Sequence, residues 1–363
     1  MVATKATPQA SCSNAGSYRP WERVIRTPGS WVHRSGGARL RTPAGRRWPE
    51  VASAYPAGMR VHPHPGTPAR VAVHTVCVTQ YPVSSADGTV LAAWRNDGDG
   101  IPLLICNGLA SSPAAWPSLR DPACGFDART WWHRGIPPSE VPRGGIEMAD
   151  HVADAIAVVD DAGWDRYLVV GWSLGVNIAL ELAAEDERVA GVLALAGIPG
   201  GTFDAMLPIP ALPREVATSL VGFATALLQR AGSQMGSLAH WLGQNPRTAE
   251  WLTSNGIIGA TADVGHVREL VRDFLGMDVH WYGRLAGGLR RHRTMDVSRL
   301  TCPVVYVSAG QDLVTDPAAV EEAAGRTPAG RVERWDATHF LVVEYPDRVR
   351  EALWDLAAEV GLG

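Results

Sequence analysis

Cysteine is scarce in this 363-residue sequence, and what there is does not suggest a disulfide framework or a zinc site. The cysteines are odd in number, isolated, and form no C-x-x-C pair. We therefore expect reduced, buried thiols and no metal. Neither a phosphate-binding loop nor a dinucleotide fingerprint is found, so no cofactor is expected. The five cysteines are Cys12, Cys77, Cys106, Cys124 and Cys302.

Long apolar runs are also missing. No run reaches the ~18 residues that a membrane-spanning helix needs, and no apolar signal segment follows the first residue. We therefore expect a soluble, cytoplasmic protein without a membrane span. Hydrophobic residues make up 46% of the chain, enough for one large core or for a core with a smaller domain.

Lysine is nearly absent, and the charge is unevenly spread. The formal net charge is −4, yet residues 1–70 are rich in arginine and contain only Glu22 and Glu50 as acids. Such a basic segment can indicate nucleic-acid binding. Because Lys5 is the only lysine of the chain, coding bias explains the arginines better than selection for phosphate contacts. No nucleic-acid partner is expected.

Residues 1–70 show no sustained hydrophobic period and are rich in Pro, Gly, Ser and Arg. This composition predicts a disordered N-terminal arm. Two origins stay open for it: a transit peptide, or a start assigned too early, with Met59 as the true first residue. The folded part is expected to begin near Arg70.

Short apolar strands and helical segments alternate from residue 71 onward, which predicts an α/β fold with a mostly parallel central sheet flanked by helices. Strands are expected at 71–81, 89–96, 102–107, 127–135, 167–170, 189–196, 303–308 and 331–335. Helices are expected at 150–162, 176–184, 317–324 and 346–360, with another through Trp116 and Leu119.

The pattern changes between residues 201 and 298, where no clear strand is found. Amphipathic helices are expected there instead, at 214–230, 235–243 and 264–289. The folded part is therefore divided into a first core segment (71–200), an inserted helical segment (201–298) and a second core segment (299–363).

The clearest chemical motif is Gly171-Trp172-Ser173-Leu174-Gly175, which stands between an apolar strand and a helix. G-x-S-x-G in this context is the nucleophile elbow. The sharp turn projects the serine hydroxyl away from the sheet, and small flanking residues avoid clashes with nearby backbone. The amides of the following helix point at the place where negative charge develops. Ser173 is therefore the candidate nucleophile.

A serine nucleophile needs a base, and the base needs an orienting acid. Both are expected in loops after the carboxyl ends of parallel strands, in the chain order Ser, acid, His. Asp312 and His339 each follow a predicted strand in that order, which completes a candidate triad with Ser173. Asp316 is the weaker alternative for the acid, because its place before Pro317 suits a helix N-cap.

Two backbone N–H groups are the candidates for an oxyanion hole. One belongs to Leu174, the residue after the nucleophile, and the other to Leu109, in the loop after the strand 102–107. The remaining histidines, His133 and His151 among them, are expected to be structural.

These motifs together resemble the α/β-hydrolase fold family over about residues 75–363. The resemblance rests on residues 107–109, 131–135, 171–175, 310–312 and 338–340. Two departures stand out: Asn107 replaces a histidine usual in the family, and Asp312 follows Gly310 by two residues where the family's acid usually follows by three. The resemblance implies that 201–298 is a cap, a helical lid over the active site.

A serine at the elbow argues against relatives that open epoxides or remove halogens, because those carry an aspartate there. The expected function is that of a serine hydrolase that cleaves a carboxylic ester, or a related acyl bond, of a small to medium apolar substrate through an acyl-enzyme. A C–C bond hydrolase, a cofactor-free perhydrolase and a non-catalytic ligand-binding protein stay open as alternatives. The expected partner is a small-molecule substrate, and assembly into a homo-oligomer is left open.

Overall fold

The computed structural model describes residues 78–109, 111–201 and 232–363. All of them belong to one compact unit, Glu50–Gly363. The expected N-terminal arm (1–70), most of the strand expected at 71–81, and the helix expected at 214–230 lie outside the described residues, as do Cys12 and Cys77.

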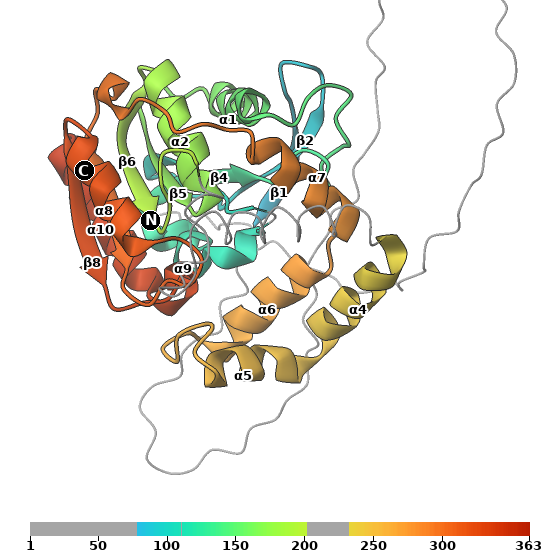
Figure 1. Cartoon of the computed structure of the whole chain (residues 1–363). Coiled ribbons are helices and arrows are strands. Elements are labelled where there is room, and N and C mark those ends of the chain that lie inside the picture. Colours follow the sequence, from blue (N-terminus) through green and yellow to red (C-terminus); the bar gives the residue numbers. More distant parts are fainter. Residues whose placement is uncertain (1–77, 110, 202–231) are drawn as a thin grey trace, which may run out of the picture. The chain divides into compact units, whose positions relative to one another are not determined.

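An eight-stranded sheet forms the centre of the described part (Figure 1). Its spatial order is β1-β2-β4-β3-β5-β6-β7-β8. Strand β2 is antiparallel to β1 and β4, and the other neighbours are parallel, so the expected mostly parallel sheet is confirmed. The strands are β1 (Thr79–Ser84), β2 (Val90–Arg95), β3 (Ile101–Cys106), β4 (Phe126–Trp131), β5 (Tyr167–Trp172), β6 (Val189–Leu195), β7 (Val304–Ala309) and β8 (Gly330–Trp335).

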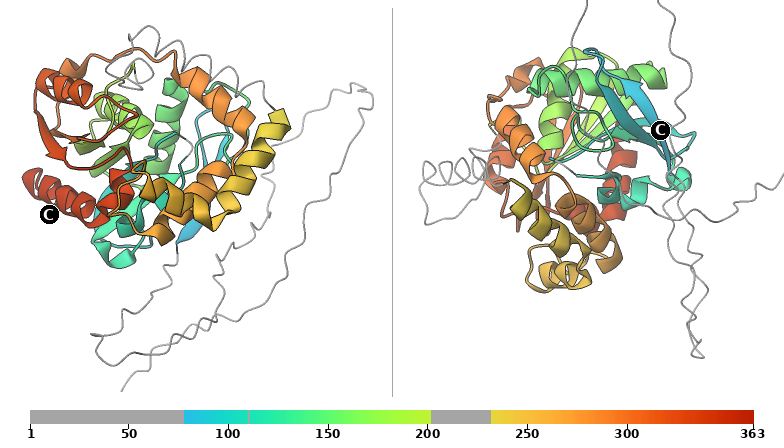
Figure 2. Two further views of the ribbon diagram at one scale, coloured as in Figure 1. Left: turned by 60° about the horizontal axis from the view of Figure 1, so that its bottom comes forward. Right: turned by 90° about the vertical axis from the view of Figure 1, so that its right-hand side faces the viewer.

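Helices flank the sheet, and a further set lies between β6 and β7 along the chain (Figures 1 and 2). The α-helices are α1 (Met148–Ala162), α2 (Leu174–Glu185), α4 (Gly232–Gln244), α5 (Pro246–Ser254), α6 (Val264–Leu275), α7 (Val279–Leu289), α8 (Pro317–Arg326), α9 (Leu341–Glu344) and α10 (Pro346–Glu359). Short 3₁₀ helices are η1 (Pro113–Ala115), η2 (Pro117–Leu119), η3 (Pro122–Cys124) and η5 (Val297–Arg299).

Successive residues of the central strands point to opposite faces of the sheet, as strand geometry requires. Leu104, Val169, Val192 and Val304 are aligned across β3, β5, β6 and β7. They pack on one face against α1, α2 and α8, whereas residues such as Ile105 face α10 on the other side. Because both faces are covered, these strands are apolar throughout rather than alternating.

The helix expected at 264–289 is wrong as a single element, because the structure has two helices there. Helix α6 ends before Gly276, and the Asp278 side chain caps α7 by accepting from the backbone N–H groups of His280 (2.8 Å) and Trp281 (3.2 Å). An aspartate that satisfies these free N–H groups favours a new helix start over continuation of the old one.

Two further local differences have similar causes. The helix expected through Trp116 and Leu119 is instead the pair of 3₁₀ turns η1 and η2, each beginning with a proline. Proline has no N–H to donate, so it stops the preceding turn from continuing. Helix α5 was not expected, although its Asn245 cap and the following Pro246 are start signals that the sequence contains.

Helices α4 to α7 lie within the segment expected to be a cap. Side-chain contacts connect α6 to the region after β3: Ser112 Oγ donates to Asp273 (2.8 Å), and Arg120 donates to both oxygens of Glu269 (3.0 and 3.1 Å). The domain boundaries and the role of a lid stay predictions.

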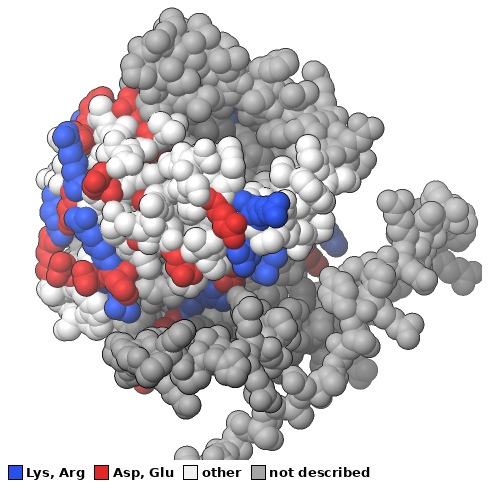
Figure 3. Space-filling model, turned by 90° about the horizontal axis from the view of Figure 1, so that it is seen from below, with Lys and Arg blue, Asp and Glu red and all other residues white. Residues whose placement is uncertain are grey.

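On the face shown in Figure 3, acidic and basic side chains of the described residues are interspersed, and neither sign forms a continuous patch. An extended basic surface is the usual electrostatic sign of nucleic-acid binding. The expectation of no nucleic-acid partner stays a prediction. In the described ranges, no helix is both long and apolar enough to cross a bilayer.

The described cysteines, Cys106, Cys124 and Cys302, are free and buried. Burial raises the pKa of the Cys302 thiol to about 11, so this side chain is a neutral thiol near pH 7. Across the described residues, no three His, Cys, Asp or Glu side chains come together as metal ligands.

A buried ion pair fixes the loop that follows β4. The guanidinium of Arg134, only 1% exposed, donates to both oxygens of Asp154 on α1 (2.9 and 2.6 Å). It also donates to Asp87 (3.0 Å) and to the carbonyl of Gly145 (2.9 Å). Burial raises the pKa of Asp154, and the hydrogen bonds from Arg134 oppose that rise. The network holds the residues beside Arg134, including His133, at the end of β4.

Replacing Asp154 with Ala is expected to lower the free energy of unfolding by about 3–5 kcal/mol, because it leaves a buried guanidinium without its main counter-ion. Denaturant unfolding of both proteins measures the difference. Asp347 is the control, because its pair with Arg350 is exposed and Asp347→Ala should change stability by less than about 1 kcal/mol. Equal, small effects in the two variants would contradict this account.

Candidate active site

Ser173 lies at the turn between β5 and α2, as expected. Its backbone has φ 56° and ψ −120°, a region that residues other than glycine rarely occupy. The Ser173 N–H donates to the carbonyl of Leu195 on β6 (2.9 Å), which ties the turn to the sheet. At Gly175 a Cβ would lie 1.9 Å from the carbonyl oxygen of Cys106, so only glycine lets α2 pack so closely on the end of β3.

His339 and Asp312 lie side by side at the ends of β8 and β7. His339 Nδ1 is 2.9 Å from Asp312 Oδ2, and the two side chains are 8% and 2% exposed. The other carboxylate oxygen accepts from the backbone N–H groups of Val314 (2.7 Å) and Thr315 (2.8 Å). Because an ionised carboxylate only accepts hydrogen bonds, Nδ1 carries the proton and Nε2 is left as a base.

Asp316, the weaker alternative for the acid, has a different position. Its Oδ1 accepts from the N–H of Ala318 (3.0 Å) and caps α8, which begins at Pro317. The structure therefore brings Asp312, and not Asp316, beside His339. The catalytic role of Asp312 stays a prediction.

Trp172 connects the serine turn to the histidine loop. Its Nε1 donates to the carbonyl of His339 (2.8 Å), and the centres of the two rings are 5.6 Å apart. Because Trp172 immediately precedes Ser173, this contact holds the turn and the loop against each other. This hydrogen bond joins segments far apart in the sequence, so no local sequence pattern predicts it.

Glu344, a residue that the sequence did not single out, holds the histidine loop from α9. The buried carboxylate accepts from the N–H of Thr338 (3.0 Å) and from the Thr338 hydroxyl. It also accepts from the N–H of Gly259 (2.9 Å), in the segment between α5 and α6. This carboxylate therefore connects the loop of His339 to the inserted helices.

The loop after β3 passes directly against the serine turn. A Cβ on Gly108 would lie 3.1 Å from the Trp172 ring, so the loop and the turn are in close contact. Leu109 follows, half-buried, and packs against the cluster of Ile136, Trp281 and Leu285. Leu174 begins α2, so its N–H is one of the helix's first four, which have no partner within the helix.

Asn107 occupies the place of the family's usual histidine, and both polar atoms of its side chain form hydrogen bonds. Its Nδ2 donates to Thr130 Oγ1 (2.8 Å) and to the carbonyl of Trp131 (2.9 Å), while its Oδ1 accepts from Trp116 Nε1 (2.8 Å). The asparagine thereby connects the end of β3 to β4 and to Trp116, which lies between η1 and η2. The loop after β3 is therefore anchored by hydrogen bonds even with asparagine in place of the family's histidine.

His133 and His151, both expected to be structural, form a buried pair with ring centres 5.3 Å apart and planes at 87°. Burial lowers the pKa of both rings, and the neighbouring His133 and Arg134 lower that of His151 further. Both rings are therefore neutral near pH 7. Within the described part of the chain, neither nitrogen of His151 has a hydrogen-bond partner.

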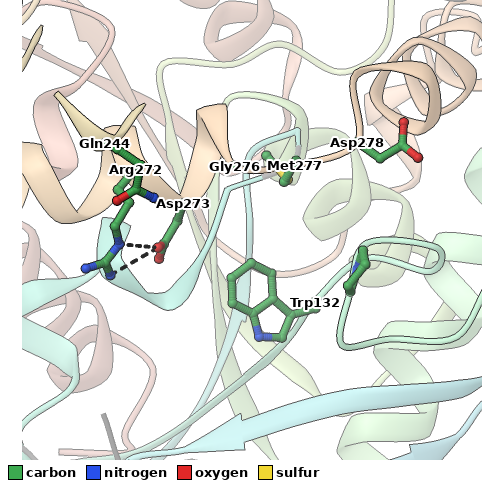
Figure 4. A pocket seen from close by; sticks show the side chains of 8 residues that line it. Trp132, Gln244, Arg272, Asp273, Gly276, Met277 and Asp278 are labelled. Carbon is green, nitrogen blue, oxygen red and sulfur yellow. Dashed lines mark hydrogen bonds and ion pairs between the residues drawn. The ribbon is translucent and has the colours of Figure 1, made fainter. Parts of the chain in front are cut away.

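A pocket of about 280 Å³ opens between the loop after β4 and the inserted helices (Figure 4). Its walls mix apolar side chains with the paired charges of Arg272 and Asp273. Trp132 and Met277 of this pocket pack on the same apolar cluster as Leu109. The pocket is lined by Trp132, Pro137, Gln244, Arg272, Asp273, Gly276, Met277 and Asp278.

The sequence model of the α/β-hydrolase fold family matches residues 101–346, more than half of the chain. The chain belongs to the α/β-hydrolase fold family. The strand order and the family match confirm the fold and the family that the sequence predicted. A comparison with curated proteins gave no match for this α/β-hydrolase.

Solved structures with the same fold include three named enzymes. The enol-lactonase from Burkholderia xenovorans LB400 has a TM-score of 0.59 at 20% identity and covers 77% of this chain and 100% of its own. The esterase RhEst1 from Rhodococcus sp. ECU1013 has a TM-score of 0.56 at 20% identity and covers 77% of this chain and 99% of its own. A thermophilic esterase from Thermogutta terrifontis has a TM-score of 0.56 at 18% identity and covers 78% of this chain and 99% of its own. At such identities the likeness shows the fold alone.

The buried histidines make a prediction about pH. The unfolded chain takes up protons on its histidines below about pH 6.5, while the folded chain resists protonation at His151. The free energy of unfolding should therefore fall as the pH drops from 7.5 to 5.5, and His151→Phe should reduce that slope by up to roughly 1.4 kcal/mol per pH unit below pH 6.5. Denaturant unfolding of the wild type and the variant at several pH values measures this pH dependence. An unchanged slope in the variant would contradict neutral burial.

Proposed function

We propose that this α/β-hydrolase is a serine hydrolase that cleaves a carboxylic ester, or a related acyl bond, of a small to medium apolar substrate. The observation that carries the proposal is the buried contact of His339 with Asp312 (2.9 Å), together with the Trp172–His339 hydrogen bond (2.8 Å) beside Ser173. A serine hydroxyl becomes a useful nucleophile only with an oriented base. Membership of the family supports hydrolysis as the type of reaction.

In the proposed first step, Ser173 Oγ attacks the carbonyl carbon of the substrate while His339 Nε2 takes the hydroxyl proton. Asp312 stabilises the imidazolium, because its carboxylate accepts a hydrogen bond from the Nδ1–H group in a buried site. His339 then passes the proton to the leaving alcohol as the C–O bond breaks, which leaves the acyl group on Ser173. Water attacks this acyl-enzyme with His339 again as base, and the acid is released.

The negative oxygen of the tetrahedral intermediate needs hydrogen-bond donors. The proposed donors are the backbone N–H groups of Leu174, at the start of α2, and of Leu109, in the loop against Trp172. Fixed donors act on charge that develops only in the transition state, and loss of one commonly costs ~10²–10³ in kcat. The reaction as proposed needs neither a metal nor a cofactor.

The pocket beside Trp132 and Met277 supports a substrate of modest size. Its volume of about 280 Å³ lies near the lower end of ligand pockets. Trp132 and Met277 of its wall pack on the same apolar cluster as the Leu109 side chain, although Leu109 is not one of the residues that line the pocket. Lactones are cyclic esters and suit the same chemistry, so they belong in the substrate panel.

Hydrolysis of p-nitrophenyl esters from acetate to laurate is expected for the wild type, with activity lost in Ser173→Ala. The variant removes the attacking oxygen and leaves the fold intact, which circular dichroism checks. The chain length with the highest kcat/KM should be short to medium, in keeping with the pocket volume. Full activity in Ser173→Ala would contradict the mechanism.

If folded wild type hydrolyses neither esters nor lactones, a C–C bond hydrolase, a perhydrolase or a ligand-binding protein would replace the proposal. The C–C hydrolase and perhydrolase share the triad and would be distinguished by substrate trials. A binding protein would in addition label slowly with serine-directed reagents.

Asp312→Asn is expected to lower kcat by roughly 10²–10⁴, because an amide facing Nδ1 favours the wrong histidine tautomer. Asp316→Asn is the matched control: it lies in the same loop, and asparagine caps helices as well as aspartate does. Steady-state kinetics of both variants decides the assignment. A larger loss in Asp316→Asn would assign the acid to Asp316 instead.

A further inference from the structure

His133 contacts the loop that carries the proposed oxyanion donor. Its Nε2 lies 3.2 Å from the carbonyl oxygen of Gly108 and 3.3 Å from that of Asn107. Carbonyl oxygens only accept hydrogen bonds, so Nε2 must carry the ring proton and donate it. The side chain is 1% exposed, so no water competes for this proton from the surface.

The Gly108 carbonyl and the Leu109 N–H belong to the same peptide unit. This unit is trans, as the one cis bond in the described residues is Pro137–Pro138. In a planar trans peptide the C=O and the N–H point in opposite directions. A donor that fixes the direction of the Gly108 oxygen therefore also fixes the direction of the Leu109 N–H.

We propose that His133 is a positioning residue of the oxyanion hole: it holds the Gly108 carbonyl on one side of the peptide plane, so that the Leu109 N–H points into the active site. The inference rests on the proposed function, because it assigns a role in stabilising the same tetrahedral intermediate. It replaces the purely structural role that the sequence suggested for His133.

The surroundings of His133 are suited to this role, because the ring has little freedom to move. It packs edge-on against Trp131 (ring centres 6.2 Å apart) and against His151 (5.3 Å). The next residue, Arg134, is held by its two hydrogen bonds to Asp154. Burial lowers the pKa of the His133 ring, so near pH 7 it is neutral, with its one proton on Nε2.

The expected loss in kcat on removing His133 is limited by other donors to the Gly108 carbonyl. The Gly108 carbonyl also accepts from the backbone N–H of Ser111 (3.0 Å) and from its hydroxyl (3.1 Å). Loss of His133 would therefore loosen the peptide rather than release it. The expected loss in kcat is about 10- to 100-fold, less than the ~10²–10³ for removal of a donor itself.

Three variants test the role with a p-nitrophenyl ester. His133→Phe keeps a planar ring but removes the donor, and it should lower kcat by about 10- to 100-fold with KM changed less than about threefold. His133→Gln carries an amide that can reach the Gly108 carbonyl, and it should restore most of kcat. His151→Phe is the matched control: it makes the same change in the neighbouring buried ring, which does not contact the loop, and should keep wild-type kcat.

Each result has a distinct meaning. Wild-type kcat in His133→Phe, a loss confined to KM, or an equal loss in all three variants would overturn the inference while leaving the proposed function intact. If His133→Phe does not fold, His133→Asn replaces it, because the shorter amide does not reach the carbonyl. Absence of Ser173-dependent hydrolysis in the wild type would instead overturn the proposed function, and this inference with it.

Discussion

The pairing of β7 with β8 is the constraint on which the candidate site depends. The strands run parallel, with Ala309 opposite Trp335, and two backbone hydrogen bonds continue the pairing beyond the strand ends. Gly310 N–H donates to the carbonyl of Trp335, and Gln311 N–H donates to that of Ala337, each over 2.9 Å. The loops are therefore joined up to the residue before Asp312. Because a shift of one residue would reverse the side chains of a strand, this register is what brings Asp312 to His339.

The rest of the site is held by buried polar side chains, each of which joins different segments of the chain. Asn107 connects the end of β3 to β4 and to Trp116, and Trp172 connects the serine turn to the loop of His339. Glu344 connects that loop to the segment between α5 and α6. Leaving a buried polar group without its partner costs free energy, so each of these contacts opposes movement of its loop. A strained serine turn and an oriented histidine can persist only in surroundings of this kind.

The sheet and the three candidate triad residues could be predicted from the sequence, because each depends on a local pattern. Ser173, Asp312 and His339 each come shortly after a strand, and parallel strands bring their carboxyl ends to one edge of the sheet. The contacts of Glu344 and His133 could not be predicted, since they join segments that meet only in the folded chain. The break between α6 and α7 was missed because amphipathic spacing continues across it, while the cap that starts the second helix is a single side chain.

Covalent labelling with a fluorophosphonate tests the central claim most directly, namely that Ser173 is a nucleophile activated by His339. Intact mass spectrometry should show one adduct per wild-type chain, with peptide mapping placing it on Ser173. Ser173→Ala should form no adduct, and His339→Gln should label at least about 100-fold more slowly, because general-base assistance is worth ~10²–10⁴. An adduct that persists in Ser173→Ala, or folded wild type that forms none, would contradict the account.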